Sequence, residues 1–142
     1  MIDTIIKFSA GGVVYDKGKV LVINWLSKKW IEFPKGTIEP GEAIENTAVR
    51  EVEEETGYKT KIITPLGNVT FEYDWTDGKH YRKTVSHFLL ELANNNEPTP
   101  NREDNEDYEN IWLTPKEASE QLTFDTDKEI LRRAVEVFEN TQ

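Results

Sequence analysis

The chain has 142 residues, of which 37% are hydrophobic and 31% charged, and this predicts one globular domain over residues 1–142. Its formal net charge of −10 disfavours nucleic acid and anionic membrane surfaces as partners, because both attract a basic patch. The absence of cysteine excludes disulfides, thiolate metal sites and cysteine nucleophiles. The first residues show neither a basic leader nor a long apolar run, so we expect a cytoplasmic protein without a membrane span.

The first forty residues predict β structure. Residues 5–15 are rich in β-forming side chains, and Gly11-Gly12 among them predicts a bulge or a close backbone approach. Residues 20–25 are a nearly continuous apolar run, which is typical of a strand buried on both faces. The remaining expectations here are a hairpin turn at 16–19, a short extended piece at 30–33 and a loop at 35–41.

The centre of the chain predicts a helix followed by more strands. The helix is expected over about 42–56, because Gly57 favours the left-handed conformation that often ends a helix. Alternating apolar and polar residues then predict a hairpin that turns at Asp77-Gly78. The strands expected in this region cover residues 59–63, 69–75 and 82–92.

The C-terminal third predicts a polar loop at 94–107, a short strand at 108–113 and two helices. The first helix begins at the capping box Thr114-Pro115-Lys116-Glu117, and the second runs from Asp125 or Thr126 to about Phe138. Strands and helices in this order favour an α/β fold with helices on both faces of a mixed sheet.

Several acidic side chains share one face of the central helix. At about 100° per residue, Glu51, Glu54 and Glu55 point to the same side, whereas Glu53 points away. Like charges at these spacings repel, and a hard divalent cation such as Mg²⁺ or Mn²⁺ would convert the repulsion into binding. Arg50 lies beside this face and can hold a carboxylate with its guanidinium fork.

A glutamate-rich helix is more often a solvent-exposed face than a metal site. The full pattern of residues from Gly36 to Tyr58 decides between these two interpretations. Seven specified positions coincide by chance on the order of 10⁻⁸ times per start site. The pattern G-x5-E-x7-R-E-U-x-E-E-x-G-U, with U a bulky apolar residue, resembles the Nudix box. The matching positions are Gly36, Glu42, Arg50, Glu51, Val52, Glu54, Glu55 and Gly57, and Tyr58 stands where the family usually has an aliphatic residue.

The resemblance implies an α/β/α sandwich that hydrolyses nucleoside diphosphates linked to a further moiety, with Mg²⁺ or Mn²⁺ as cofactor. Glu51 and Glu54 are both candidates for the base that deprotonates the attacking water. Arg50 is expected to orient the acidic cluster, and Glu42 to stabilise the loop and the helix start. The metal ligands that the resemblance implies are the Gly36 carbonyl, Glu51, Glu54, Glu55 and, from the acidic loop, Glu103 or Glu106.

Residues outside the box resemble those of dinucleoside polyphosphate hydrolases. WIEFPKG at 30–36 and KTVSHFL at 83–89 are similar to motifs in which lysines contact the polyphosphate, which assigns that role to Lys35 and Lys83. Tyr73 lies close to the position of a tyrosine characteristic of these enzymes. Tyr73, Trp75 and Tyr81 are candidates to stack on adenine, although packing is the commoner role for any single aromatic.

The leading hypothesis is therefore hydrolysis of a dinucleoside polyphosphate such as diadenosine tetraphosphate. The main alternative is a house-cleaning pyrophosphatase for nucleoside triphosphates. Nucleotide-sugar hydrolysis is disfavoured because a proline expected for ADP-ribose enzymes is missing, and RNA 5′ ends are disfavoured by the acidity. A non-catalytic nucleotide-binding module is disfavoured because the box carboxylates are all present. Nudix domains occur as monomers and as homodimers, and both states remain open.

Overall fold

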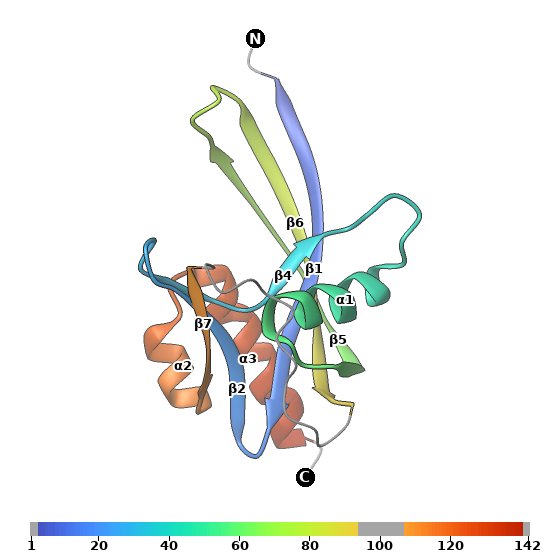
Figure 1. Cartoon of the computed structure of the whole chain (residues 1–142), viewed down its shortest axis with the longest axis vertical. Coiled ribbons are helices and arrows are strands. Elements are labelled where there is room, and N and C mark those ends of the chain that lie inside the picture. Colours follow the sequence, from blue (N-terminus) through green and yellow to red (C-terminus); the bar gives the residue numbers. More distant parts are fainter. Residues whose placement is uncertain (1–2, 94–106, 141–142) are drawn as a thin grey trace.

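The structure is a computed structural model that describes residues 3–93 and 107–140 (Figure 1). The strands of this part are β1 (Thr4–Asp16), β2 (Lys19–Trp25), β3 (Trp30–Glu32), β4 (Lys35–Thr37), β5 (Thr60–Asp74), β6 (His80–Leu92) and β7 (Tyr108–Leu113). The helices are α1 (Ile44–Thr56), α2 (Pro115–Gln121) and α3 (Asp125–Asn140).

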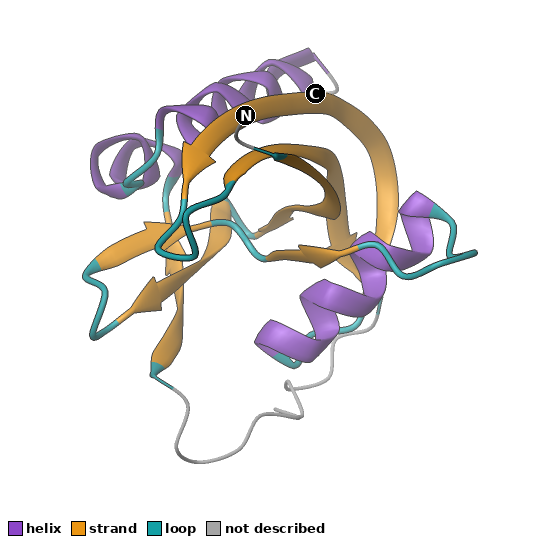
Figure 2. Ribbon diagram, turned by 90° about the horizontal axis from the view of Figure 1, so that it is seen from above, coloured by secondary structure: helices purple, strands orange, loops and turns teal. Residues whose placement is uncertain are grey.

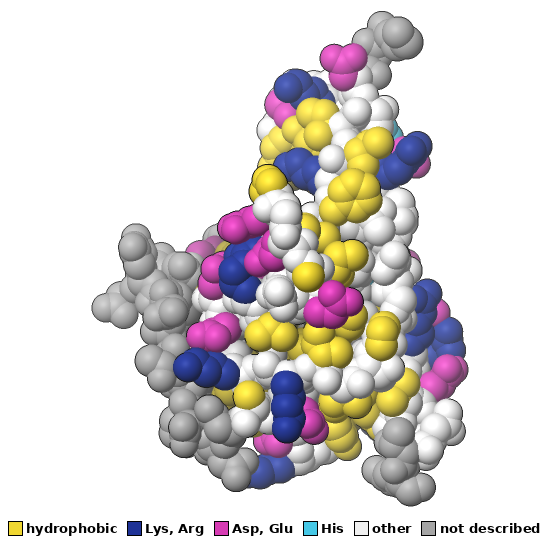
Figure 3. Space-filling view, turned by 90° about the vertical axis from the view of Figure 1, so that its right-hand side faces the viewer, with side chains coloured by type: hydrophobic (Ala, Val, Ile, Leu, Met, Phe, Trp, Pro, Cys, Tyr) yellow, Lys and Arg dark blue, Asp and Glu magenta, His cyan; other side chains and the backbone are white. Residues whose placement is uncertain are grey.

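The strands form one mixed sheet in the order β3-β2-β1-β6-β5, with β4 added beside β1 and β7 beside β2. β1 and β6 run parallel over eleven residue pairs, from Thr4↔His80 to Val14↔Leu90, and the other pairs are antiparallel. The outer parts of β1, β5 and β6 project from the body as an arm (Figure 1). Hydrophobic side chains are exposed along this arm (Figure 3), including Ile6 and Phe8.

Alternating side chains divide the core into two layers, because successive residues of a strand point to opposite faces. Val13 packs in the cluster that includes Ile130 and Ala134 of α3, whereas its neighbour Val14 packs in the cluster that includes Val52 of α1. The sheet consequently lies between α1 on one side and α2 with α3 on the other (Figure 2). Leu21 of β2 joins the α1 layer, which confirms that β2 is buried on both faces. The predicted α/β/α sandwich is confirmed.

The predicted helix ends follow local sequence chemistry. Gly57 adopts φ 81°, and its backbone N–H donates to the Glu53 carbonyl at 2.8 Å, which closes the last turn of α1. Thr114 and Glu117 form the predicted capping box at the start of α2.

Three predicted boundaries were wrong. Residues 35–37 form β4 rather than a loop, because Gly11 of β1 lets the neighbouring chain approach closely: a Cβ at Gly11 would lie 2.1 Å from the Pro34 carbonyl oxygen. α1 begins at Ile44 rather than near residue 42. The two strands predicted at 59–63 and 69–75 are the single strand β5, which accommodates the intervening Pro65 and Gly67 through register shifts.

Candidate active site

Arg50 connects the acidic face of α1 to the preceding loop. Its Nε donates to Glu42 Oε2 at 2.8 Å, and its Nη1 donates to Glu51 Oε1 at 2.9 Å and to Glu54 Oε1 at 3.1 Å. Its Nη2 donates to the Thr37 carbonyl at 3.1 Å. The hydrogen bonds that Glu42 accepts from Arg50, and after them the one from Thr47, lower the pKa of the Glu42 carboxyl to about 2. Glu42 therefore acts as an anionic anchor for Arg50 and for the loop, as the sequence predicts.

Gly36 of β4 lies directly against Glu51. A Cβ placed on Gly36 would lie 2.0 Å from Glu51 Cδ, so a glycine is needed for this contact. The backbone of β4 and a carboxylate of α1 thus meet although fifteen residues separate them in sequence. The two predicted ligands are brought together, and their role in metal binding stays a prediction.

The three box carboxylates have different surroundings. Glu51 and Glu54 both accept hydrogen bonds from Arg50, whereas Glu55 interacts electrostatically with Lys35 and accepts a hydrogen bond from its backbone. Burial raises the pKa of the Glu55 carboxyl to about 8, against the lowering effect of Lys35. Burial also raises the pKa of Glu51, although Arg50 opposes the shift.

A hard divalent cation fits the chemistry of this donor set. In residues 3–93 and 107–140, no three metal-binding side chains already converge, and Glu51 and Glu54 direct their carboxylates to Arg50. The raised pKa of Glu55 shows a carboxylate whose negative charge lacks solvation, and a cation would supply that stabilisation. Glu103 and Glu106, the further predicted ligands, lie outside the described residues.

The Glu55 carboxyl makes the metal-free protein sensitive to pH. Its pKa is about 8 in the folded chain against an ordinary 4.5, so the folded state retains a proton that the unfolded state has lost between these values. The contribution of Glu55 to folding stability in EDTA therefore falls as pH rises from about 4.5 to about 8. We expect the melting temperature to fall between about pH 6.5 and 8, because the opposite effect of His87 ends at its ordinary pKa of 6.5 and the effect of Asp127 ends near its folded pKa of about 6.

The Glu55→Gln variant is expected to lose most of this decline in melting temperature, and excess Mg²⁺ is expected to reduce it in the wild type. The part that remains is expected from His80, whose pKa is raised above 6.5 by hydrogen bonds to Asp74 and Glu72. Glu53→Gln is the matched control on the same helix and is expected to behave like the wild type. A flat wild-type profile in EDTA would contradict the buried state of Glu55.

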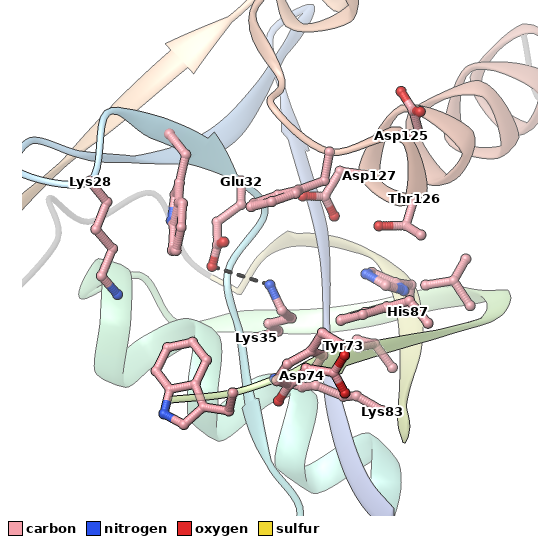
Figure 4. A pocket seen from close by; sticks show the side chains of 16 residues that line it. Lys28, Glu32, Lys35, Tyr73, Asp74, Lys83, His87, Asp125, Thr126 and Asp127 are labelled. Carbon is pink, nitrogen blue, oxygen red and sulfur yellow. Dashed lines mark hydrogen bonds and ion pairs between the residues drawn. The ribbon is translucent and has the colours of Figure 1, made fainter. Parts of the chain in front are cut away.

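A cavity of about 590 Å³ is lined in part by Lys35, the residue before Gly36 on β4 (Figure 4). Five aromatic side chains contribute to its walls, together with three lysines and several carboxylates. The lining residues are Lys28, Trp30, Glu32, Lys35, Val69, Phe71, Tyr73, Asp74, Trp75, Lys83, Val85, His87, Phe124, Asp125, Thr126 and Asp127. Because Lys35 precedes Gly36 on β4, this strand joins the cavity to the acidic cluster.

The two predicted phosphate-contacting lysines both line this cavity but differ electrostatically. Lys35 Nζ forms an ion pair with Glu32 at 3.1 Å. Burial alone would lower the pKa of Lys35, but Glu32, Asp127 and Glu55 outweigh it and the net pKa is raised. The pKa of Lys83 is lowered, mainly by burial and then by the nearby Lys35 charge. An anion entering the cavity would meet Lys83 as a poorly solvated cation.

Tyr73 and Tyr81 take different positions. Tyr73 lines the cavity, whereas Tyr81 is buried and stacks on Tyr73 with ring centroids 5.2 Å apart. The Tyr81 hydroxyl donates to Asp77 in the turn before β6. Tyr81 supports Tyr73 rather than lining the cavity, because cross-strand pairing places the two rings side by side.

Several polar or aromatic lining residues were not among the predicted site residues. They include Trp30, Glu32, His87 and Asp127. His87 is buried, as its apolar strand indicates. Asp127 falls in the first turn of α3, where an acid is ordinarily a helix-stabilising residue, so the sequence carries no signal for a role in a cavity.

Across the described ranges, no helix is long and apolar enough to cross a membrane.

Comparison with known proteins identifies similar sequences and folds. The model of the NUDIX domain family matches residues 6–134. A putative mutator protein MutT4 of Mycobacterium tuberculosis is 34% identical over 109 residues, which cover 77% of this chain and 42% of that protein. An ADP-ribose pyrophosphatase of Bacillus subtilis is 42% identical over 57 residues, or 37% of this chain and 31% of that protein. The chain thus spans less than half the length of these two relatives.

Solved structures share the fold at lower sequence identity. A C. elegans Ap4A hydrolase in a binary complex superposes with a TM-score of 0.74 and 22% identity, covering 94% of this chain and 98% of that one. A NUDIX hydrolase from Nitrosomonas europaea gives a TM-score of 0.70 and 19% identity over 96% of this chain and 73% of that one. These similarities confirm the arrangement of helices and sheet.

Proposed function

The chain belongs to the Nudix family, and from this premise we propose that it hydrolyses a phosphoanhydride bond in a nucleoside diphosphate-X compound. A dinucleoside polyphosphate such as diadenosine tetraphosphate is the first candidate substrate. The observation that carries the proposal is that Lys35, which lines an aromatic cavity together with Lys83, directly precedes Gly36, which lies against Glu51 of the acidic cluster. An acidic metal site, cations for phosphate and flat apolar walls for a base are the three features that such a substrate requires.

Proteins of this family generally use divalent metal ions, and we infer Mg²⁺ or Mn²⁺ here. The Gly36 carbonyl, Glu51, Glu54 and Glu55 would hold the ion, with Glu103 as a further candidate ligand. A bound ion neutralises phosphate charge and lowers the pKa of water.

In the proposed reaction, Glu51 or Glu54 accepts the proton of the attacking water. Arg50 holds both carboxylates from one side through its Nη1, so it sets which of their oxygens remain available. The proposed base and the proposed metal ligands are therefore neighbouring glutamates on the same helix.

The substrate contacts follow from the cavity. Lys35 and Lys83 would bind the phosphate chain, since ammonium groups in a poorly solvated site pair strongly with phosphate oxygens. Tyr73 would contact the base, with Tyr81 stacked behind it. Glu32 keeps Lys35 in place in the absence of substrate.

A nucleoside triphosphate pyrophosphatase is the second candidate. A putative mutator protein is similar over 77% of this chain, and its name specifies no substrate. The similarity to an ADP-ribose pyrophosphatase is higher in identity but covers only 37% of the chain. A non-catalytic module is a weaker candidate, because the box carboxylates and their Arg50 contacts are all in place.

The test is Mg²⁺-dependent turnover on a panel of diadenosine polyphosphates, nucleoside triphosphates and ADP-ribose. On the preferred substrate, Lys83→Ala is expected to lower kcat/KM by about 10- to 100-fold, the effect of losing one charged hydrogen bond. Arg82→Ala is the matched control, because Arg82 is exposed on the opposite face of β6 and pairs with Glu72. Equal kcat/KM values for Lys83→Ala and wild type would contradict the phosphate contact, and no turnover on the whole panel would contradict the proposed activity.

A further inference from the structure

Two side chains that line the cavity each have a buried polar atom without a hydrogen-bond partner. Within the described part of the chain, these atoms are Asp127 Oδ2 and Trp30 Nε1, while the Asp127 carboxyl also accepts a bond from the Phe33 backbone. Asp127 is 4% exposed. Buried polar atoms are nearly always hydrogen-bonded in folded proteins, so such a group lining one cavity indicates that a ligand completes the bonding.

Asp127 is placed to receive a hydrogen-bond donor from the cavity. It lies in the first turn of α3, and its carboxylate is directed into the space that His87 and Lys35 also face (Figure 4). Burial raises the pKa of Asp127 to about 6, against the lowering effect of Lys35, so the side chain is mainly an ionised acceptor at neutral pH. The free Oδ2 atom therefore requires an N–H or O–H group from the ligand.

The walls around Asp127 suit a flat ring. Trp30 and Phe124 meet edge to face with centroids 5.4 Å apart, and Tyr73 and Trp75 meet in the same way at 6.3 Å. Trp75 is 59% exposed, so much of its ring surface remains available at the cavity rim. Aromatic surfaces with a few directed polar groups are typical of sites that bind and orient planar heterocycles.

We propose that the cavity binds an aminopurine, adenine first, and that Asp127 selects it by accepting a hydrogen bond from the exocyclic amino group. This inference rests on the proposed nucleotide hydrolysis and names the base that the site prefers. A purine with hydrogen in place of the amino group leaves Oδ2 unpaired. A purine with a carbonyl there places two acceptors against each other. Both are expected to bind more weakly.

The test measures binding without turnover. AMP and purine riboside 5′-monophosphate, which lacks the 6-amino group, are titrated in EDTA while tryptophan fluorescence is recorded. The wild type is expected to bind AMP at least about tenfold more tightly, the effect of one hydrogen bond to a charged acceptor. Asp127→Ala is expected to bring the ratio of the two Kd values to about one. Asp127→Asn, which keeps an acceptor oxygen and a similar shape, is expected to give an intermediate ratio.

Glu139→Ala is the matched control, because Glu139 is an acid on the same helix but is exposed and does not line the cavity. It is expected to keep the wild-type ratio. The proposal is overturned by a wild type without preference for AMP, or by an Asp127→Ala protein that folds and keeps the preference. If Asp127→Ala does not fold, a wild-type ratio in Asp127→Asn overturns it equally. A preference that depends on Asp127 in a protein without hydrolytic activity would refute the proposed reaction and leave this inference standing.

Discussion

Replacing Glu54 by glutamine is expected to lower kcat by about three orders of magnitude at saturating Mg²⁺, while the fold is retained. The amide keeps the shape of the side chain but neither accepts a proton at neutral pH nor neutralises a cation. The Glu54 side chain is 54% exposed, so the loss of its charge leaves no buried group unpaired. Removing one of several like charges offsets the loss of the ion pair between Glu54 and Arg50. Turnover is measured by product release, and the fold by circular dichroism and thermal melting.

Glu53→Gln is the control for this prediction. The change in charge is the same and lies one residue away, but Glu53 points away from the face that carries Glu51 and Glu54. Its turnover is expected to stay within about twofold of wild type, the range of ordinary surface substitutions. Comparable losses in both variants would indicate a general effect of helix charge. A Glu54→Gln protein that fails to fold would indicate a structural role for Glu54.

The Gly36→Ala variant is expected to lose at least about 100-fold in turnover with little loss of stability. The added Cβ would lie 2.0 Å from Glu51 Cδ, so the carboxylate must move. The end of a glutamate side chain rotates at low cost, so the fold survives, but the proposed ligand or base leaves its position. Gly36 also forms part of a regular strand pair with Ala10, which an alanine can enter. Turnover and thermal melting measured on one preparation separate the two effects.

Alanine substitutions at two other glycines serve as comparisons for Gly36→Ala. A Cβ at Gly12 would lie 2.1 Å from the Phe88 carbonyl oxygen, which belongs to the backbone of the paired strand and has little freedom to move. Gly12→Ala is therefore expected to destabilise the protein strongly. Gly18 lies in an open turn at φ 80°, and apart from Gly18 and its two chain neighbours no atom of the described residues lies within 4 Å of the Cβ that an alanine would add there. Gly18→Ala is expected to lose about 1 kcal/mol of stability and no turnover. A Gly36→Ala protein with wild-type turnover would show that the position of Glu51 does not matter.

Local sequence chemistry was sufficient for most of the fold. The apolar run of β2, the Gly57 helix end and the Thr114 capping box each depend on neighbours within a few residues, and all three are confirmed. The boundaries that were wrong depend on distant partners. β4 exists because β1 lies beside it, and β5 continues through Pro65 because β6 pairs with both of its halves.

The sequence by itself determined the family and the acidic face of α1, because a helix converts fixed spacing into a fixed direction without help from the rest of the chain. Tertiary structure alone decided what surrounds those acids. It placed Gly36 against Glu51, paired Lys35 with Glu32, and brought Asp127 from α3 into the cavity. Burial and long-range contact set these relations, and burial also raises the pKa of Glu55 to about 8. The spacing of residues along the chain predicts neither their burial nor their long-range contacts.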